Sequence, residues 1–171
     1  MVTDGVRVPD DGKARLVVAT YNVHGCVGFD GVEDPERVAR VIRSLECDIV
    51  GLQEVHSRAD PRFVLRQLDH LAALTDMHAI AGPTILRGED HFGNALLTRH
   101  EIHKTVRHDL SYRRREPRGA LDVTVLAERS AIRVVVTHLG LRATERRYQV
   151  RRLLAALETA RTDAPVIVLA D

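Results

Sequence analysis

Residues 16–25 read L-V-V-A-T-Y-N-V-H-G, an apolar run that ends in polar side chains. β-branched residues are frequent in Leu16–Val23, which predicts a buried strand. The arrangement recurs as D-I-V-G-L-Q-E at 48–54, I-R-V-V-V-T-H at 132–138 and P-V-I-V-L-A-D at 165–171. A hard cation binds oxygen ligands, and an attacking water needs a carboxylate or an imidazole to orient it. The four strand ends therefore indicate a metal-assisted phosphoester site.

The composition predicts one soluble domain, and the absence of an apolar stretch in Met1–Lys13 argues against a secretory signal. The chain has 171 residues and a net charge of +1, so no global field favours nucleic acid or an anionic membrane. No apolar run is long enough to cross a membrane. Residues 1–14 are expected to form a flexible lead-in and residues 15–171 the domain. Cys26 and Cys47 are expected to be free thiols in a reducing, cytoplasmic compartment, with a single disulfide as the alternative.

Helix signals lie between the apolar runs. Asp34-Pro35 and Asp60-Pro61 each place an N-cap residue before a proline at the first helical position. Thr144 is expected to cap a third helix. The inner stripe of that helix would be Val150, Leu153, Leu154 and Leu157.

Further strands are expected between and after these helices. Leu121, Val123 and Val125 alternate with polar residues, which predicts a strand with one wet face. The wholly apolar segment 165–170 predicts a central strand. The remaining predicted strands are Asp48–Gln53, Met77–Ala81, Asn94–Thr98, Ile102–His108 and Ile132–Thr137. The pattern allows a two-sheet sandwich or a doubly wound sheet.

Six motifs in order carry a resemblance to a known family. They are A-T-Y-N-V-H-G (19–25), D-I-V-G-L-Q-E-V (48–55), F-G-N-A-L-L-T-R (92–99), E-P-R-G-A-L (116–121), V-V-V-T-H-L (134–139) and V-I-V-L-A-D (166–171). Together they resemble the endonuclease/exonuclease/phosphatase superfamily, the metal-dependent phosphoesterases related to DNase I. The resemblance implies a four-layer α/β sandwich of two mainly antiparallel sheets with outer helices.

The resemblance also implies roles for residues at the strand ends. Glu54 would be the principal Mg²⁺ ligand, with Mn²⁺ as an alternative ion, and Asn22 would lie beside the metal and the phosphate. His138 would stabilise the negative charge that develops on the scissile phosphate. Asp171 would orient the attacking water. Asp171 corresponds to the aspartate of the family's Gly-Asp-x-Asn motif, so the sequence is expected to lack the C-terminal third of the domain.

That expectation has a structural consequence. Apolar residues that later strands would cover should be exposed in Ile167–Leu169 or in Val134–Val136.

Three further residues are candidates for contact with the substrate. Arg118 precedes Gly119, a residue that allows close backbone approach. Its guanidinium could bind a phosphate with two hydrogen bonds. Asn94 could line the same cleft or be structural. His24 shares a strand face with Asn22 and could contact substrate or cap the strand. The other histidines are expected at the surface: His56, His70, His78, His91, His100, His103 and His108.

The residues leave the substrate open among a small phosphodiester, a phospholipid headgroup and nucleic acid. The near-neutral charge and the absence of tryptophan weaken the case for nucleic acid. No protein partner can be inferred. The alternative to a metal-dependent phosphoesterase is a catalytically dead fragment or phosphate-binding module on the same scaffold.

Overall fold

The computed structural model describes most of the chain, and its described segments are residues 15–57, 66–88, 90–127, 130–160 and 162–171. In these segments the helices are α1 (Pro35–Ser44), α2 (Gln67–Thr75), α3 (Ala143–Thr159) and the short 3-10 helix η1 (His24–Cys26). The strands are β1 (Val18–Asn22), β2 (Ile49–Ser57), β3 (His78–Arg87), β4 (Asp90–Thr98), β5 (Glu101–Asp109), β6 (Gly119–Ala127), β7 (Ser130–Thr137) and β8 (Val166–Ala170).

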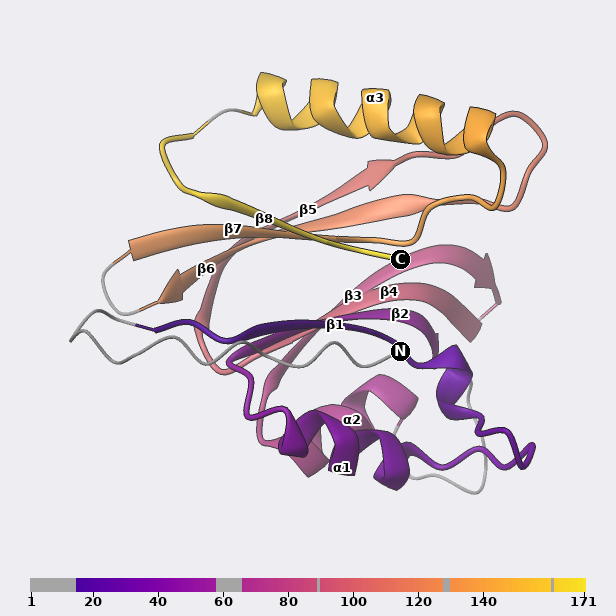
Figure 1. The fold of residues 1–171 in the computed structure, drawn as a ribbon, viewed down its shortest axis with the longest axis vertical. Helices are drawn as coiled ribbons and strands as arrows, with labels where there is room; N and C mark the ends of the chain where they lie inside the picture. The colour runs from indigo at the N-terminus through magenta and orange to yellow at the C-terminus, as the bar shows by residue number, and fades with distance from the viewer. Residues whose placement is uncertain (1–14, 58–65, 89, 128–129, 161) are drawn as a thin grey trace.

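The strands form two four-stranded sheets that face each other. The first has the order β1-β2-β4-β3 and the second the order β5-β6-β7-β8. The pairs β1–β2 and β7–β8 are parallel, and the other pairs are antiparallel. Helices α1 and α2 cover the outer face of the first sheet and α3 covers the second, which gives four layers (Figure 1). The four-layer sandwich expected from the resemblance is confirmed.

The core between the sheets is apolar and tightly packed. Ile49, Leu96 and Val123 are fully buried there. Gly51 lies where the two sheets approach closely, because a Cβ atom at this position would lie 2.8 Å from Leu169 Cδ1 and 3.0 Å from Val136 Cγ2. A side chain at residue 51 would therefore push the two sheets apart.

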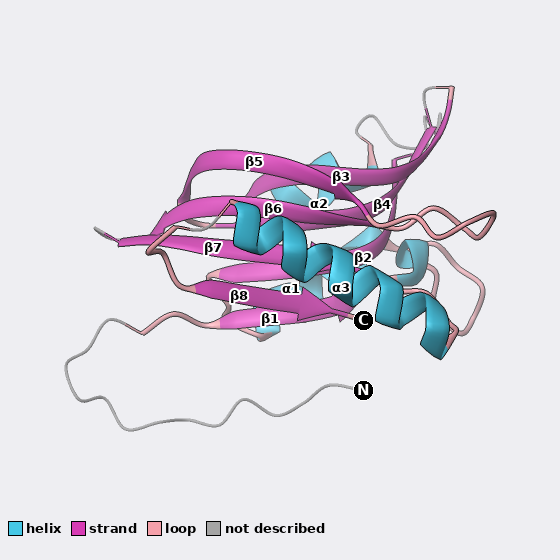
Figure 2. Cartoon of the chain, turned by 90° about the horizontal axis from the view of Figure 1, so that it is seen from above, coloured by secondary structure: helices cyan, strands magenta, loops and turns pink. Residues whose placement is uncertain are grey.

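The edges of the two sheets that carry β1 and β8 lie side by side (Figure 2). The strand expected at 165–170 is β8, which is the last strand of its sheet among the described residues. Val168 is 48 % exposed, whereas Leu169 and the whole of Val134–Val136 are buried. The expected exposure is thus found on one face of β8 and not on β7.

Helix α1 begins as the sequence predicts, and α3 does not. The side chain of Asp34 accepts a hydrogen bond from the backbone N–H of Arg37 (2.8 Å), and Pro35 occupies the first turn. Helix α3 begins one residue before Thr144, which therefore lies inside the helix and does not cap it. The signal at Asp60-Pro61 and the lead-in at 1–14 fall outside the described residues.

The inner stripe of α3 also differs from the prediction. Leu153 is buried and Leu157 packs beside it, but Val150 and Leu154 face solvent. Glu145 and Gln149 take their places on the buried face, two turns and one turn before Leu153, respectively. Gln149 is accommodated because its Oε1 accepts from the backbone N–H of Gly140 (2.7 Å) and its Nε2 donates to Glu145 (3.3 Å). Hydrogen bonds allowed polar residues to occupy a stripe that apolar periodicity alone assigned elsewhere.

Strand β6 has no wet face, contrary to the prediction. It lies in the second sheet with the first sheet on one side and α3 on the other, so Asp122 is only 3 % exposed. The guanidinium of Arg133 pairs with its carboxylate (Nε–Oδ1 2.8 Å), as does the ring of His108 (Nε2–Oδ2 2.9 Å). His108 is therefore part of a buried charge cluster and not a surface residue. His100, with its Nε2 atom buried, departs from the same prediction.

Both cysteines are buried free thiols, as predicted. None of the described helices is long and apolar enough to cross a membrane.

Candidate functional site

Four polar residues meet at one end of the sandwich because of the sheet order. Asn22 ends β1, Glu54 lies near the end of β2, His138 follows β7 and Asp171 follows β8. The parallel pairs β1–β2 and β7–β8 direct their carboxyl ends to the same side, and β1 lies beside β8. Residues up to 149 positions apart in the sequence are thereby brought into contact.

A β-bulge presents the side chain of Glu54 to this end of the sheet. The register of β2 against β4 shifts between Leu52 and Val55, and Glu54 takes a positive φ of 59°. Leu52 and Val55 both pack beneath α1 and α2 although they are three residues apart, which regular alternation would not allow. The extra residue in the bulge is Glu54, whose left-handed backbone is the type of strain found at functional sites.

The amide of Asn22 joins two carboxylates from different sheets. Its Nδ2 donates to Glu54 Oε1 (2.8 Å) and to Asp171 Oδ2 (2.7 Å). Its Oδ1 accepts from the backbone N–H of His24 (3.0 Å), which fixes the orientation of the amide. Asn22 therefore directs its nitrogen, and not its oxygen, toward the two acidic groups.

The imidazole of His138 lies between the same two carboxylates. Its Nδ1 is 3.8 Å from Glu54 Oε1 and its Nε2 is 3.7 Å from Asp171 Oδ2. These separations are too long for hydrogen bonds but close enough for electrostatic attraction when the ring is protonated. The side chain of His138 is mostly buried, whereas that of Asp171 is 53 % exposed. The site is thus open to solvent on the side of Asp171.

Arg118 and Asn94 border a narrow crevice together with Glu54 and His138. Arg118 is 9 % exposed and donates from Nη1 to Glu116 (2.6 Å), while its Nε atom is buried with no hydrogen-bond partner. Asn94 donates to the backbone oxygen of Gly119 (2.9 Å), which is the first residue of β6 in the opposite sheet. The guanidinium of Arg118, a residue that lines the crevice, thus keeps one unpaired N–H, and such a group is suited to an anion.

His24 lies on the other side of Glu54. Its ring is exposed and belongs to η1, in which His24, Gly25 and Cys26 all have positive φ angles. The structure does not bring His24 into the crevice with Arg118 and Asn94. It lines a separate groove of about 450 Å³ that shares Glu54 with the crevice. We call this the side groove; its lining residues are His24, Val27, Glu54, His56, Ile85, Arg87, Asp90, His91 and Phe92.

Gln67 supports the site and was missed by the sequence reasoning. Its side chain is buried in the first turn of α2 and donates to the backbone oxygen of Gly25 (2.9 Å) and to Glu33 (2.9 Å). Its Oε1 accepts from the backbone N–H of His56 (2.9 Å). Gln67 thereby joins the turn after β1 to the strand that carries Glu54. No motif marks this residue, because its partners are two backbone groups and the Glu33 side chain, all distant in sequence.

The thiol of Cys26 lies close to this turn but is chemically quiet. Burial, reinforced by the negative charges of Glu33, Asp34 and Glu36, raises its pKa to about 12. The thiolate, which is the nucleophilic form, is therefore scarce at neutral pH.

The donor set at the strand ends fits a hard divalent cation. The hydrogen bond from Asn22 reaches Oε1 of Glu54, and among the described residues no side chain bonds Oε2. In the same part of the chain no group of three or more His, Cys, Asp and Glu residues encloses a metal by itself. Mg²⁺ typically takes one or two carboxylates and keeps several waters, so this open arrangement is compatible with it.

Comparison with known proteins agrees with this arrangement. The model of the Endonuclease/Exonuclease/phosphatase family matches residues 19–171. The protein named "Uncharacterized protein YbhP" of Escherichia coli K12 is 30 % identical over 164 residues, which are 90 % of this chain and 65 % of that protein. The chain therefore spans about 65 % of the length of this curated relative.

Solved structures show the same fold. An endonuclease/exonuclease/phosphatase from Beutenbergia cavernae is 27 % identical with a TM-score of 0.67, over 90 % of this chain and 46 % of that one. A family protein from Bacteroides thetaiotaomicron is 16 % identical with a TM-score of 0.74, over 91 % of this chain and 62 % of that one.

The fold and the matched residues define a protein of the DNase I-like class. The chain belongs to the Endonuclease/Exonuclease/phosphatase family, whose members are hydrolases that include nucleases and phosphatases.

Proposed function

We propose that the protein is a Mg²⁺-dependent phosphoesterase that hydrolyses its substrate with an activated water. The observation that carries the proposal is the Asn22 amide that holds Glu54 and Asp171 side by side, with hydrogen bonds of 2.8 Å and 2.7 Å. Two adjacent carboxylates repel each other unless a donor or a cation lies between them. The Asn22 amide supplies a donor to one oxygen of each carboxylate, and a cation bound at the other oxygen of Glu54 would complete the compensation.

The side chains have separate roles in this proposal. Glu54 holds the metal through the oxygen that Asn22 leaves free, and Asn22 positions both carboxylates. The bound metal would polarise the phosphoryl group and lower the pKa of a bound water. Asp171, which is half-exposed at the open side of the site, orients the attacking water.

The crevice supplies the groups that receive the phosphate. Arg118 offers its unpaired Nε to a phosphate oxygen, and His138 lies close enough to donate to the charge that develops on it. Asn94 fixes the wall of the crevice through its bond to Gly119. This anion pocket would be useful to a phosphate-binding module as well as to an enzyme.

Glu54→Gln tests the metal assignment, with Glu101→Gln on the exposed start of β5 as the matched control. Mn²⁺ or Mg²⁺ titration, followed by water relaxation or calorimetry, should give one weak site that E54Q removes and E101Q retains. Hydrolysis of bis-p-nitrophenyl phosphate that requires both Mg²⁺ and Glu54 supports the phosphoesterase. Glu54-dependent metal binding without turnover indicates the phosphate-binding module. Equal metal binding by E54Q and the wild-type protein would overturn both.

A further inference from the structure

The side groove adjoins the crevice, because Glu54 and Phe92 line both. A phosphate held at Arg118 and His138 would therefore have its ester group directed past Glu54 into the groove. The groove volume of about 450 Å³ lies within the range of roughly 300–1,000 Å³ that is usual for pockets that bind small molecules. The lining should then decide which ester group fits.

One wall of the groove is built from closely packed rings. The rings of His56 and Phe92 have centroids 4.6 Å apart and planes inclined at 56°. Gly25 also approaches the His56 ring, since a Cβ atom there would be 2.6 Å from His56 Cδ2. Only glycine leaves space for the imidazole, and its φ of +60° also favours glycine. The wall is therefore preformed and cannot easily yield to an incoming ligand.

The rest of the lining combines apolar surface with a charged rim. Val27 and Ile85 add apolar surface next to the rings, whereas Arg87, Asp90 and His91 contribute polar or charged groups. An acyl chain would leave these polar groups facing hydrocarbon, which is unfavourable. A flat ring would cover the aromatic wall with one face and leave the rim in contact with water.

We propose that the side groove binds a flat aromatic ring carried by the phosphate ester, either a simple aryl group or a nucleobase. This assignment rests on the proposed function only for the position of the phosphate. Phe92 and His56 would be the residues that determine specificity, acting by contact with the ring. Their preference should be for aromatic esters over alkyl esters of similar size.

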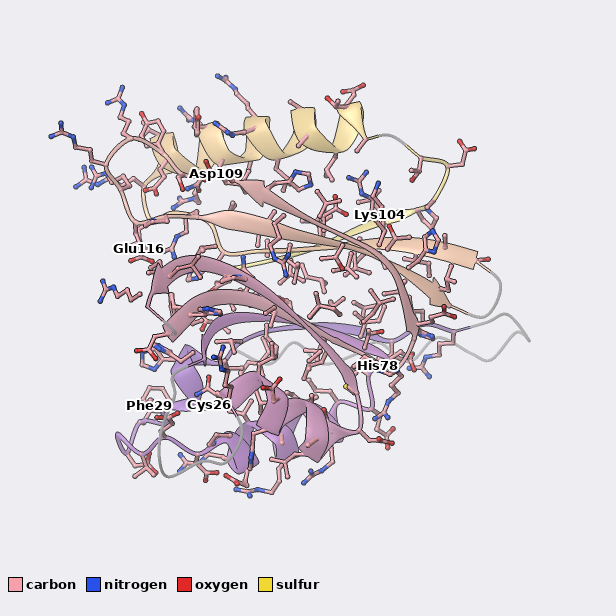
Figure 3. The ribbon with its side chains drawn as sticks, turned by 180° about the vertical axis from the view of Figure 1, so that it is seen from behind. Cys26, Phe29, His78, Lys104, Asp109 and Glu116 are labelled. Carbon is pink, nitrogen blue, oxygen red and sulfur yellow. The ribbon has the colours of Figure 1, made fainter. Side chains whose placement is uncertain are left out.

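Non-hydrolysable phosphonates test the preference in the presence of Mg²⁺. By calorimetry, phenylphosphonate should bind about tenfold more tightly than hexylphosphonate or inorganic phosphate, as expected for one ring-on-ring contact. Phe92→Leu keeps an apolar side chain and should reduce the preference to within about twofold. Phe29→Leu is the matched control, because Phe29 is fully exposed on the loop after η1 and outside the groove (Figure 3). Thymidine 5′-monophosphate in the same series distinguishes a nucleobase from a simple aryl group, and either ring binding better than hexylphosphonate supports the proposal.

Two failures remain distinguishable. Inorganic phosphate that does not bind, or that binds E54Q equally well, counts against the proposed function. Phosphate that binds through Glu54 with no gain from the phenyl ring overturns the groove assignment, as does a preference that survives F92L. If no phosphate binds, NMR signals of the His56 and His91 rings still test the groove, because phenylphosphonate that leaves them unshifted also overturns it.

Discussion

Replacing Arg133 with methionine should destabilise the protein by about 3–5 kcal/mol, because it removes one partner of a buried ion pair. Arg133 and Asp122 are 5 % and 3 % exposed, and the guanidinium Nε lies 2.8 Å from the carboxylate Oδ1. The Nη1 atom also donates to the backbone oxygen of Ala160 at the end of α3 (2.9 Å). R133M would leave the carboxylate of Asp122 paired with the ring of His108 at 2.9 Å and would remove the hydrogen bond at the end of α3.

Urea denaturation followed by far-UV circular dichroism measures the loss. For a chain of this size, about 3–5 kcal/mol corresponds to a fall in Tm of roughly 6–20 °C. Arg37→Met is the matched control, since the Arg37–Asp30 pair has a similar separation of 2.8 Å but both side chains are at least 40 % exposed, at 41 % and 50 %. Exposed pairs contribute little, so R37M should leave the midpoint nearly unchanged.

The double substitution Asp122→Leu with Arg133→Met completes the test. Removing both charges leaves neither of them buried alone, so the double variant should be less destabilised than the sum of the single variants. The reasoning is refuted if R133M loses no more stability than R37M, or if the two single losses simply add. Either result would mean that water or a backbone shift replaces the missing partner.

Two further outcomes follow from the same contacts. Burial alone would raise the pKa of Asp122, but hydrogen bonds from Arg133 and His108 outweigh it and hold the pKa below its usual range. The unfolded chain therefore takes up the proton first, so the free energy of unfolding should fall as the pH drops below about 5. Asp122→Asn should flatten this fall in urea titrations at a series of pH values. Gln67→Leu should weaken Mn²⁺ binding at Glu54, because it removes the hydrogen bonds to Gly25 and His56. The control Gln149→Leu makes the same substitution on the buried face of α3 and should reduce stability but not metal affinity. Equal metal affinity in Q67L and the wild-type protein would show that Gln67 supports the fold only.

The sequence predicted the strands well because their apolar residues alternate or run together in a way that few other structures produce. Residues 16–23 and 132–137 are recognisable strands, and both end at the site. The cap at Asp34 was predictable for the same local reason, since an N-cap and its proline are adjacent in sequence. Features determined within a few residues could therefore be read directly.

Features that depend on distant partners could not be read. The bulge at Glu54 arises from the register of β2 against β4, and the sequence of neither strand indicates it. The burial of Gln149 could not be read from the helix pattern, because the partner that makes burial tolerable, Gly140, lies in the preceding loop. The side groove was missed because His56 and Phe92 are paired only across two strands.

Formation of the site depends on docking of the two sheets. Asn22 and Glu54 belong to the first sheet, whereas Asp171 follows β8 of the second, and the Asn22 amide bonds both carboxylates. The sheets approach closely at Gly51, three residues before Glu54 in the same strand. The core that holds the sheets together therefore also sets the distance between the two carboxylates. A cation placed between the two carboxylates would have its ligand positions set by the same packing of the core. A site with few ligands could in this way have a precise geometry while remaining open to solvent.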